Sequence, residues 1–192
     1  GCRYTESELR LIWDRYRNDE EYLTTLNGGF VLIMADYQQN KIILALDQIG
    51  QKSLYYAQTD TGLVFASNAD FVISHINVTN TISQQSIYDY VYFHHCPSPN
   101  SIYQQVKKLE GSQVLTFHQE KISLSYYWQP VFKEVLNHSL DSAVEDLQKK
   151  LLNSVEASVS NIEETGAFLS GGLDSSTVTG LLSKAFPGQA KT

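Results

Sequence analysis

The sequence predicts a mixed fold of helices and strands in two parts, a strand-rich first part followed by the start of an α/β domain. Apolar runs separated by turn residues recur through residues 30–127, which is typical of antiparallel hairpins. A helical spacing of apolar residues follows at 139–159, and then come an apolar run, a glycine-rich loop and another helix. The pattern changes within 131–138, so we expect one domain over 1–130, a linker over 131–138 and a second domain over 139–192.

The first part is predicted to open with a helix over residues 5–16. Thr5 and Glu8 have the spacing of a capping box, in which each side chain satisfies a backbone N–H of the other. Ser83 is the expected cap of another helix, over 84–93. The residues expected to face inward from that helix are Ile87, Tyr90 and Val91. The predicted strands cover residues 30–35, 41–46, 53–58, 63–67, 113–117 and 122–127.

Composition and charge exclude several classes of protein. Of the 192 residues, 42% are hydrophobic, which is enough for a core, and the net charge of −7 with no long basic run argues against a nucleic-acid or anionic-membrane partner. Cys2 and Cys96 are too few and too far apart for a disulfide framework or a metal site. No signal peptide and no apolar run of membrane-spanning length is visible, so we expect a cytoplasmic enzyme.

The second part is predicted to open with a helix over 139–159, in which Ser142 and Glu145 have the spacing of a capping box. Residues 167–169 predict a short buried strand. Residues 170–176 then read Ser-Gly-Gly-Leu-Asp-Ser-Ser and lead into another helix. A strand–loop–helix unit of this kind needs parallel neighbours to bury its faces, so we expect the chain to be an internal piece of a longer protein.

The loop at 170–176 has the features of a phosphate-binding site. Gly171 and Gly172 allow the backbone to turn sharply and approach a ligand, and the following helix presents unpaired N–H groups at its positive end. Hydroxyl groups close to that point belong to Ser170, Ser175 and Ser176. Because no lysine follows Gly172, the loop is not of the Walker type. It predicts a different kind of phosphate or pyrophosphate site.

Several residues allow two interpretations. Asp174 either helps to position Mg²⁺ or caps the helix, where a carboxylate is favoured in any case. Phe168 and Leu169 are expected in the core, although the end of the strand could also touch an adenine ring. His94 and His95 precede a proline-containing loop, where they either bind a metal or take a helix-terminal or interdomain role.

The Ser-Gly-Gly-Leu-Asp-Ser-Ser stretch resembles the pyrophosphate loop of the ATP-pyrophosphatase enzymes. Segments of the first part resemble, in the same order, the glutaminase domain of asparagine synthetase-type enzymes. These segments are Leu26–Phe30, Leu46–Tyr56, Phe65–Ser67, Pro97–Tyr103, Val106–Leu109 and Tyr127–Trp128. The resemblance spans essentially the whole chain. It implies a partial α+β N-terminal-nucleophile-type sandwich, followed by the start of an α/β ATP-pyrophosphatase domain of the adenine nucleotide α-hydrolase-like type.

The resemblance implies an ATP-dependent ligase. In the family, an N-terminal cysteine releases ammonia from glutamine, ATP with Mg²⁺ converts aspartate into β-aspartyl-AMP, and ammonia displaces AMP to form asparagine. The implied ligands of ATP or pyrophosphate are Leu169, Ser170, Gly171, Gly172, Asp174, Ser175 and Ser176. The implied partners are glutamine and aspartate or another carboxylate, with no nucleic acid and no membrane, and with a homodimer left open.

The glutaminase half departs from the family pattern in three places. The catalytic cysteine of the family lies upstream of residue 1 and Cys2 is not in its place, so no catalytic residue is expected within this chain. Glu6 stands where the family has an aspartate that binds the amino group of glutamine. Asp47 lacks two arginines and a proline that accompany it in the family. Either its carboxylate is left unpaired in a glutaminase half that has drifted, or this branch pairs Asp47 differently.

Three functions therefore stay open. The first is glutamine-dependent asparagine synthesis by the full-length protein. The second is adenylation of a carboxylate and closure of an internal amide with an inactive glutaminase half, as in β-lactam synthetases and lasso-peptide macrocyclases. The third is a non-catalytic remnant. Under all three we expect the 192-residue chain alone to be inactive.

Overall fold

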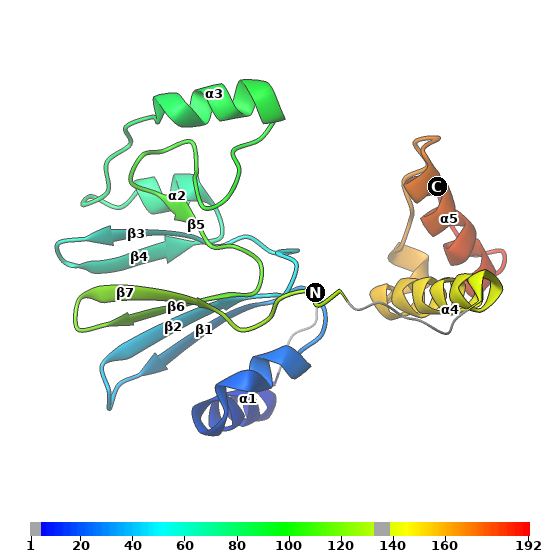
Figure 1. Ribbon diagram of the computed structural model, residues 1–192, viewed down its shortest axis with the longest axis horizontal. Coiled ribbons are helices and arrows are strands. Elements are labelled where there is room, and N and C mark those ends of the chain that lie inside the picture. The colour runs from blue at the N-terminus through cyan, green and yellow to red at the C-terminus, as the bar shows by residue number, and fades with distance from the viewer. Residues whose placement is uncertain (1–4, 133–138) are drawn as a thin grey trace. The chain divides into compact units, whose positions relative to one another are not determined.

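The computed structural model describes residues 5–132 and 139–192, and the chain divides into two compact units (Figure 1). The first unit is Gly1–Val131 and the second is Phe132–Thr192. Cys2 and most of the expected linker lie outside the described residues. In the described part of the chain, no helix is long and apolar enough to cross a membrane.

The first unit contains two antiparallel sheets. The larger has the strand order β1-β2-β6-β7 and the smaller has the order β4-β3-β5. The strands are β1 (Val31–Asp36), β2 (Lys41–Leu46), β3 (Tyr55–Thr59), β4 (Gly62–Ala66), β5 (Lys107–Lys108), β6 (Gln113–His118) and β7 (Lys121–Tyr126). Ile43 in β2 pairs with Met34 on one side and with Thr116 on the other. The predicted mixed fold with antiparallel hairpins is therefore confirmed.

Helices lie on both outer faces of the stacked sheets, so the first unit has four layers in the order α, β, β, α (Figure 1). A core cluster that contains Ile12 and Ile43 packs the first helix on the larger sheet. A cluster that contains Leu44 and Tyr56 fills the space between the sheets, and one that contains Val72 lies beyond the smaller sheet. The helices of this unit are α1 (Glu6–Asn18), the 3-10 helix η1 (Glu20–Thr25), α2 (Ala69–Ile73) and α3 (Gln84–Phe93).

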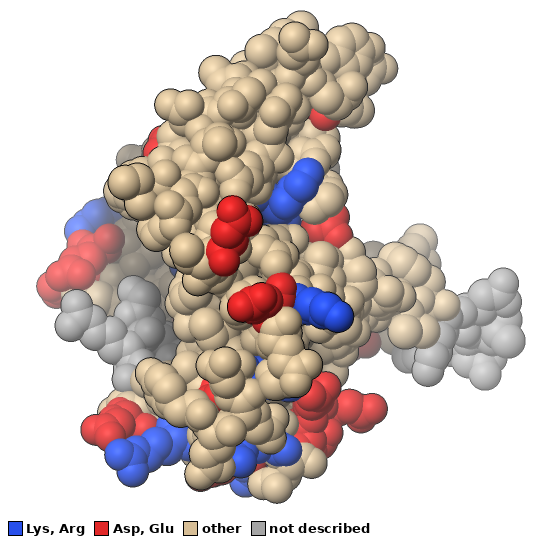
Figure 2. Space-filling view, turned by 90° about the vertical axis from the view of Figure 1, so that its left-hand side faces the viewer, with Lys and Arg blue, Asp and Glu red and all other residues tan. Residues whose placement is uncertain are grey.

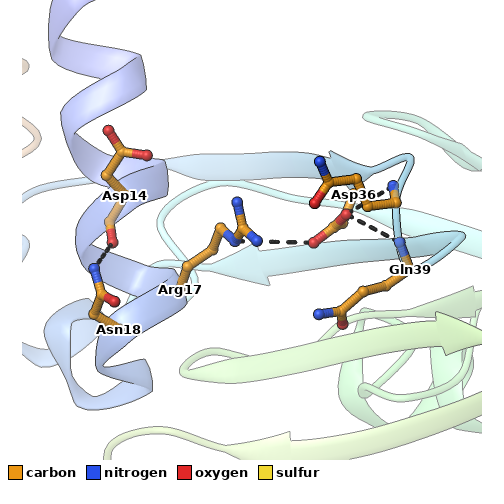
Figure 3. Close-up of polar contacts among 6 residues, drawn as sticks. Asp14, Arg17, Asn18, Asp36 and Gln39 are labelled. Carbon is orange, nitrogen blue, oxygen red and sulfur yellow. Dashed lines mark hydrogen bonds and ion pairs between the residues drawn. The ribbon is translucent and has the colours of Figure 1, made fainter.

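α1 is held at both ends. The predicted capping box is confirmed, since the Glu8 backbone N–H donates to Thr5 Oγ1 at 3.4 Å and the Thr5 N–H donates to Glu8 Oε2 at 2.6 Å. At the other end, Arg17 Nε lies 3.9 Å from Oδ2 of the buried Asp36, and Asp36 Oδ1 accepts backbone hydrogen bonds from Gln39 and its neighbour (Figure 3). The helix is thus tied to the β1–β2 turn by a carboxylate whose oxygens are all engaged.

α3 has the predicted bounds and the predicted cap, because the Ser86 N–H donates to Ser83 Oγ at 3.2 Å. The prediction that one of its faces points inward is wrong, since Ile87, Tyr90 and Val91 are 49%, 58% and 70% exposed. The reason is α2, a short helix that the sequence pattern did not predict. Because α2 packs on the smaller sheet, α3 lies farther out (Figure 1).

A buried carboxylate organises the turn from β2 to β3. Asp47 is 0% exposed, and its two oxygens accept hydrogen bonds from the backbone N–H groups of Gln51 at 2.8 Å and Lys52 at 3.0 Å. Its C=O accepts from the N–H groups of Gly50 and Ser112. Of the two alternatives, an unpaired Asp47 is therefore wrong, and different pairing in this branch is confirmed. Backbone N–H groups satisfy the carboxylate without a guanidinium group.

The second unit contains α4 (Leu140–Ser158), the 3-10 helix η2 (Ile162–Glu164) and α5 (Leu173–Ala185). The predicted helix α4 is confirmed, but the predicted cap is wrong. Ser139 caps the helix, and its side chain accepts a hydrogen bond from the Ser142 N–H at 3.2 Å. The Ser142–Glu145 pattern therefore lies inside the first turns of the helix rather than at its start.

The predicted strand at 167–169 does not form as a strand. Instead, Gly166 and Lys191 make an isolated parallel bridge, supported by a 2.9 Å hydrogen bond from the Ala167 N–H to the Lys191 C=O. Because this bridge joins segments before and after α5, it has the connectivity of a β-α-β unit. Within 139–192 no further strand pairs with it, so the apolar residues that follow Gly166 have no sheet to join.

We predict that Asp47→Asn lowers the free energy of unfolding of the first unit by about 1–3 kcal/mol, because the amide NH₂ would face a backbone N–H donor. Urea unfolding followed by tryptophan fluorescence measures this loss. The matched control is Asp60→Asn at an exposed turn, which should leave the free energy unchanged. Equal stability of Asp47→Asn and the unchanged chain would contradict the role of the carboxylate.

Burial first, and then the negative charge of Glu20, raise the pKa of Tyr16 to about 12. In the unfolded chain the phenol loses its proton near pH 10.0, whereas the folded state holds the proton to higher pH. Stability should therefore be complete below about pH 10 and fall as the pH rises toward 12. In unfolding experiments across this range, Tyr16→Phe should weaken the pH dependence, and the exposed Tyr37→Phe should not. Identical profiles for Tyr16→Phe and the unchanged chain would refute this.

Candidate functional site

The glycine-rich loop of the second unit runs directly into α5. Gly171 has a φ of +85°, a left-handed conformation that glycine adopts at little cost. Gly172 is the N-cap of α5, and no side chain caps this helix, whereas α1, α2, α3 and α4 each have a side-chain cap. Among the α-helices of the described residues, α5 is therefore the one whose first turn is left without a side-chain acceptor.

Two predicted serines meet across the loop. Ser170 Oγ and Ser175 Oγ lie 2.9 Å apart, and Ser175 Oγ also donates to the Gly172 C=O at 3.1 Å. The backbone N–H of Ser176 donates to the same carbonyl at 3.0 Å, and its side chain is exposed. The structure thus brings the hydroxyl groups of Ser170 and Ser175 together, beside Gly172, and leaves that of Ser176 apart from this pair.

Asp174 lies in the first turn of α5, and its side chain is exposed. Gly172 holds the N-cap position, so the interpretation of Asp174 as the cap is wrong, although its charge still suits the positive end of the helix. In the described parts of the chain, no group of three or more His, Cys, Asp or Glu side chains could hold a metal ion, and this includes His94 and His95. Mg²⁺ typically uses one or two carboxylates together with phosphate oxygens, so Asp174 fits it as a single protein ligand beside a bound nucleotide.

The apolar residues before the loop are not buried. Phe168 is 97% exposed and Leu169 is 56% exposed, so the prediction that they belong to the core is wrong. The reason is that their segment makes only the isolated bridge at Gly166 and has no sheet to cover it. Phe168 instead lines a cavity of about 600 Å³, together with Asp174 and Ser175.

Part of the lining of this cavity comes from residues that the sequence analysis did not single out. Ser154 and Ser158 of α4 line it, and they lie one helical turn apart with Val155 and Val159 next to them. Small polar residues four positions apart on the otherwise apolar face of a helix were the signal that could have revealed this part of the lining.

Glu6, the residue expected to bind glutamine, lies in the first unit at the start of α1. Its Oε1 accepts a hydrogen bond of 2.7 Å from Arg10 Nη2, and both side chains are largely exposed. Glu6 and Arg10 line a cavity of about 300 Å³ with residues of β1, among them Met34. Exposed ion pairs of this type contribute only about 0–1 kcal/mol, so a ligand with an ammonium group could displace Arg10.

Two family models match the chain. The model described as a glutamine amidotransferase domain matches residues 5–128, and the model described as asparagine synthase matches residues 146–192. The chain belongs to the asparagine synthetase (glutamine-hydrolyzing) family. The family that the sequence resembles is thereby confirmed, and with it the relation to ligases and glutamine amidotransferases.

Relatives within this family match most of the chain. A Methanocaldococcus jannaschii protein provisionally named asparagine synthetase (glutamine-hydrolyzing) 2 is 32% identical over 161 residues, which cover 81% of this chain and 31% of the relative. Asparagine synthetase (glutamine-hydrolyzing) 1 of Bacillus subtilis is 28% identical over 185 residues, which cover 95% of this chain and 29% of the relative. The chain thus spans less than a third of the length of these relatives.

A solved structure is also similar to the chain. It is the glutamine phosphoribosylpyrophosphate amidotransferase from B. subtilis complexed with ADP and GMP, with a TM-score of 0.43 and 14% sequence identity. The match covers 100% of this chain and 40% of that one. A likeness at this level is too weak to decide the fold.

We predict that Gly172→Ala weakens pyrophosphate binding by this chain about tenfold while leaving its structure intact. An added Cβ would meet Ser170 Oγ at 3.6 Å and Ser175 Oγ at 3.9 Å, which is ordinary contact for the protein but fills the space between the proposed ligands. Calorimetry with sodium pyrophosphate measures the loss. The control is Gly180→Ala, which adds the same methyl group within α5. A Cβ at Gly180 would have no atom within 4 Å, so this variant should bind pyrophosphate as the unchanged chain does. An equal affinity in the two variants would exclude the loop as the binding site.

Proposed function

We propose that this chain is part of an ATP-dependent ligase that forms asparagine from aspartate, glutamine and ATP through β-aspartyl-AMP. The observation that carries the proposal is the presence, in one chain, of a glutamine amidotransferase domain and of the Ser-Gly-Gly-Leu-Asp-Ser-Ser loop that opens the uncapped helix α5. The first would release ammonia and the second would hold the nucleotide that activates a carboxylate. These are the two requirements of one amide-forming reaction.

In the second unit, we assign the pyrophosphate of ATP to the loop. The first-turn N–H groups of α5 and the hydroxyl groups of Ser170, Ser175 and Ser176 would donate to its oxygens, which supports departure of the negatively charged leaving group. Asp174 would hold Mg²⁺, which neutralises phosphate charge when bound. The exposed side chain of Leu169 supports its assignment as an apolar contact for the adenine ring.

In the first unit, we assign the four layers to a partial N-terminal-nucleophile sandwich, with no catalytic residue among those described. Glu6 would bind the amino group of glutamine in exchange for Arg10. The proposal includes a cytoplasmic location, because ATP and free amino acids are the reactants, and it leaves a homodimer open.

Glu6 also favours a second candidate function. Its side chain is one methylene longer than the aspartate of the family pattern, and it is paired with Arg10 on the surface of α1. A protein that has lost glutamine hydrolysis would tolerate both the longer side chain at position 6 and its pairing with Arg10. It would still adenylate a carboxylate at the loop and close an amide with an internal amine.

The complete protein that contains this chain should release AMP from ATP when aspartate and Mg²⁺ are present, with glutamine or ammonium as nitrogen donor. AMP release with ammonium alone would favour an inactive glutaminase half. AMP release only with an amine-bearing carboxylate would favour internal ring closure, and its absence with every substrate would indicate a remnant. The 192-residue chain alone should release none.

In the same assay, Asp174→Asn should lower AMP release by about tenfold or more, because the carboxylate that holds Mg²⁺ is lost. Asp141→Asn is the matched control, since Asp141 is likewise an exposed acid in the first turn of a helix. Equal activity of the two variants would remove Asp174 from the site.

A further inference from the structure

The first unit holds a second cavity that the proposed function does not use. It measures about 520 Å³, and its lining residues come from α2, α3, β3, β5 and the loop after α3. This volume is within the range of about 300–1,000 Å³ that is typical of small-molecule sites. Its lining residues are Tyr55, Ala69, Tyr90, His94, His95, Cys96, Asn100, Ser101, Ile102 and Lys108.

The charge of this lining is opposite to that of the chain. The chain has a net charge of −7, yet the lining contains one lysine, two histidines and no acidic side chain. The surface near α3 also carries few charges. α3 has a single charged residue, Asp89. In the view of Figure 2, few charged side chains appear at the top of the molecule, where α3 lies. No acidic side chain of the lining itself would therefore repel an anion in the cavity.

Lys108 and Asn100 are the lining residues whose polar groups can donate hydrogen bonds to a ligand. Lys108 is half-buried, takes part in none of the ion pairs among the described residues, and has its Nζ 5.9 Å from the centre of the Tyr55 ring. Asn100 Oδ1 accepts a 3.0 Å hydrogen bond from Lys107 Nζ, which fixes the amide and leaves Nδ2 as a donor. One ammonium group and one oriented amide thus line the same cavity.

Three further groups of the lining, on Ser101, Cys96 and Tyr55, are described by their own contacts or surroundings. Ser101 Oγ donates to Val106 C=O at 2.8 Å, and Cys96 Sγ donates to Ser86 C=O at 3.6 Å. Burial first, then Cys96 and Asp70, raise the pKa of Tyr55, so its phenol remains a neutral donor near pH 7. Asp70 does not line the cavity.

We propose that this cavity binds a small planar organic anion of the aromatic carboxylate class, with its carboxylate at Lys108 and Asn100 and its ring beside Tyr55 and Tyr90. One permanent positive charge matches one negative charge. The two phenol rings provide the flat apolar walls that an aromatic ring prefers. The proposal is independent of the nucleotide loop and of glutamine.

Benzoate and its neutral analogue benzamide test the charge requirement by calorimetry on the whole chain. Benzoate should bind at least about tenfold more tightly than benzamide, because benzamide has no carboxylate to form a charge-assisted hydrogen bond with Lys108. Lys108→Gln should weaken benzoate binding by about the same factor. Lys121→Gln, an equal change of charge on the exposed strand β7, should have no effect. Equal binding of the two probes, equal losses in the two variants, or no binding of benzoate would each overturn the proposal.

Cys96 gives a test of location that needs no variant. The rate at which iodoacetamide alkylates Cys96, followed by mass spectrometry of its peptide and separately from Cys2, should fall when benzoate is saturating. Benzamide at the same concentration should leave the rate unchanged. Saturating benzoate without protection of Cys96 would place the anion elsewhere and refute the assignment.

Discussion

The first unit depends on one buried side chain, the carboxyl group of Asp47. Its hydrogen bonds to two backbone N–H groups shape the turn that carries the chain from β2 in the larger sheet to β3 in the smaller one. The loop before β6 lies directly on this turn. A Cβ at Gly111 would come within 2.9 Å of Gly50 N and of Ile49 C, so only glycine fits there. Tyr127 adds a 2.8 Å hydrogen bond from its hydroxyl group to Leu46 C=O. The turn therefore sets how the two sheets stack, and with them the layers of helices outside.

Because backbone groups satisfy Asp47, the stability of the first unit does not depend on whether the protein hydrolyses glutamine. The family pattern around Asp47 has two arginines that this chain lacks, yet the carboxylate is satisfied by the backbone itself. Loss of those arginines therefore does not require loss of the fold. Both candidate functions are compatible with the same four layers. What separates them is the state of Glu6 and the cysteine expected upstream, not the packing of the sheets.

The two units differ in how much apolar surface they bury. Three core clusters link the layers of the first unit. In the described part of the second unit, the buried residues are Thr179 and Leu182, while Phe168 and Leu173 are exposed. The same openness leaves the loop before α5 accessible to a ligand, and the parallel bridge at Gly166 shows where a sheet would have to extend to cover these side chains.

Local sequence patterns were enough to predict β1, β2, β3, β4, β6 and β7, the caps Thr5 and Ser83, and the loop that opens α5. These features depend on periodicity and on side chains within one turn of the backbone that they satisfy. The sequence motifs also indicated the family to which the chain belongs. Tertiary structure decided what local patterns do not contain. α2 lies between α3 and the sheet, so an apolar face expected inside lies open. Backbone N–H groups satisfy the carboxylate of Asp47, for which the sequence shows no cation. Burial and charge pairing depend on residues distant in sequence, and only the folded chain brings those residues together.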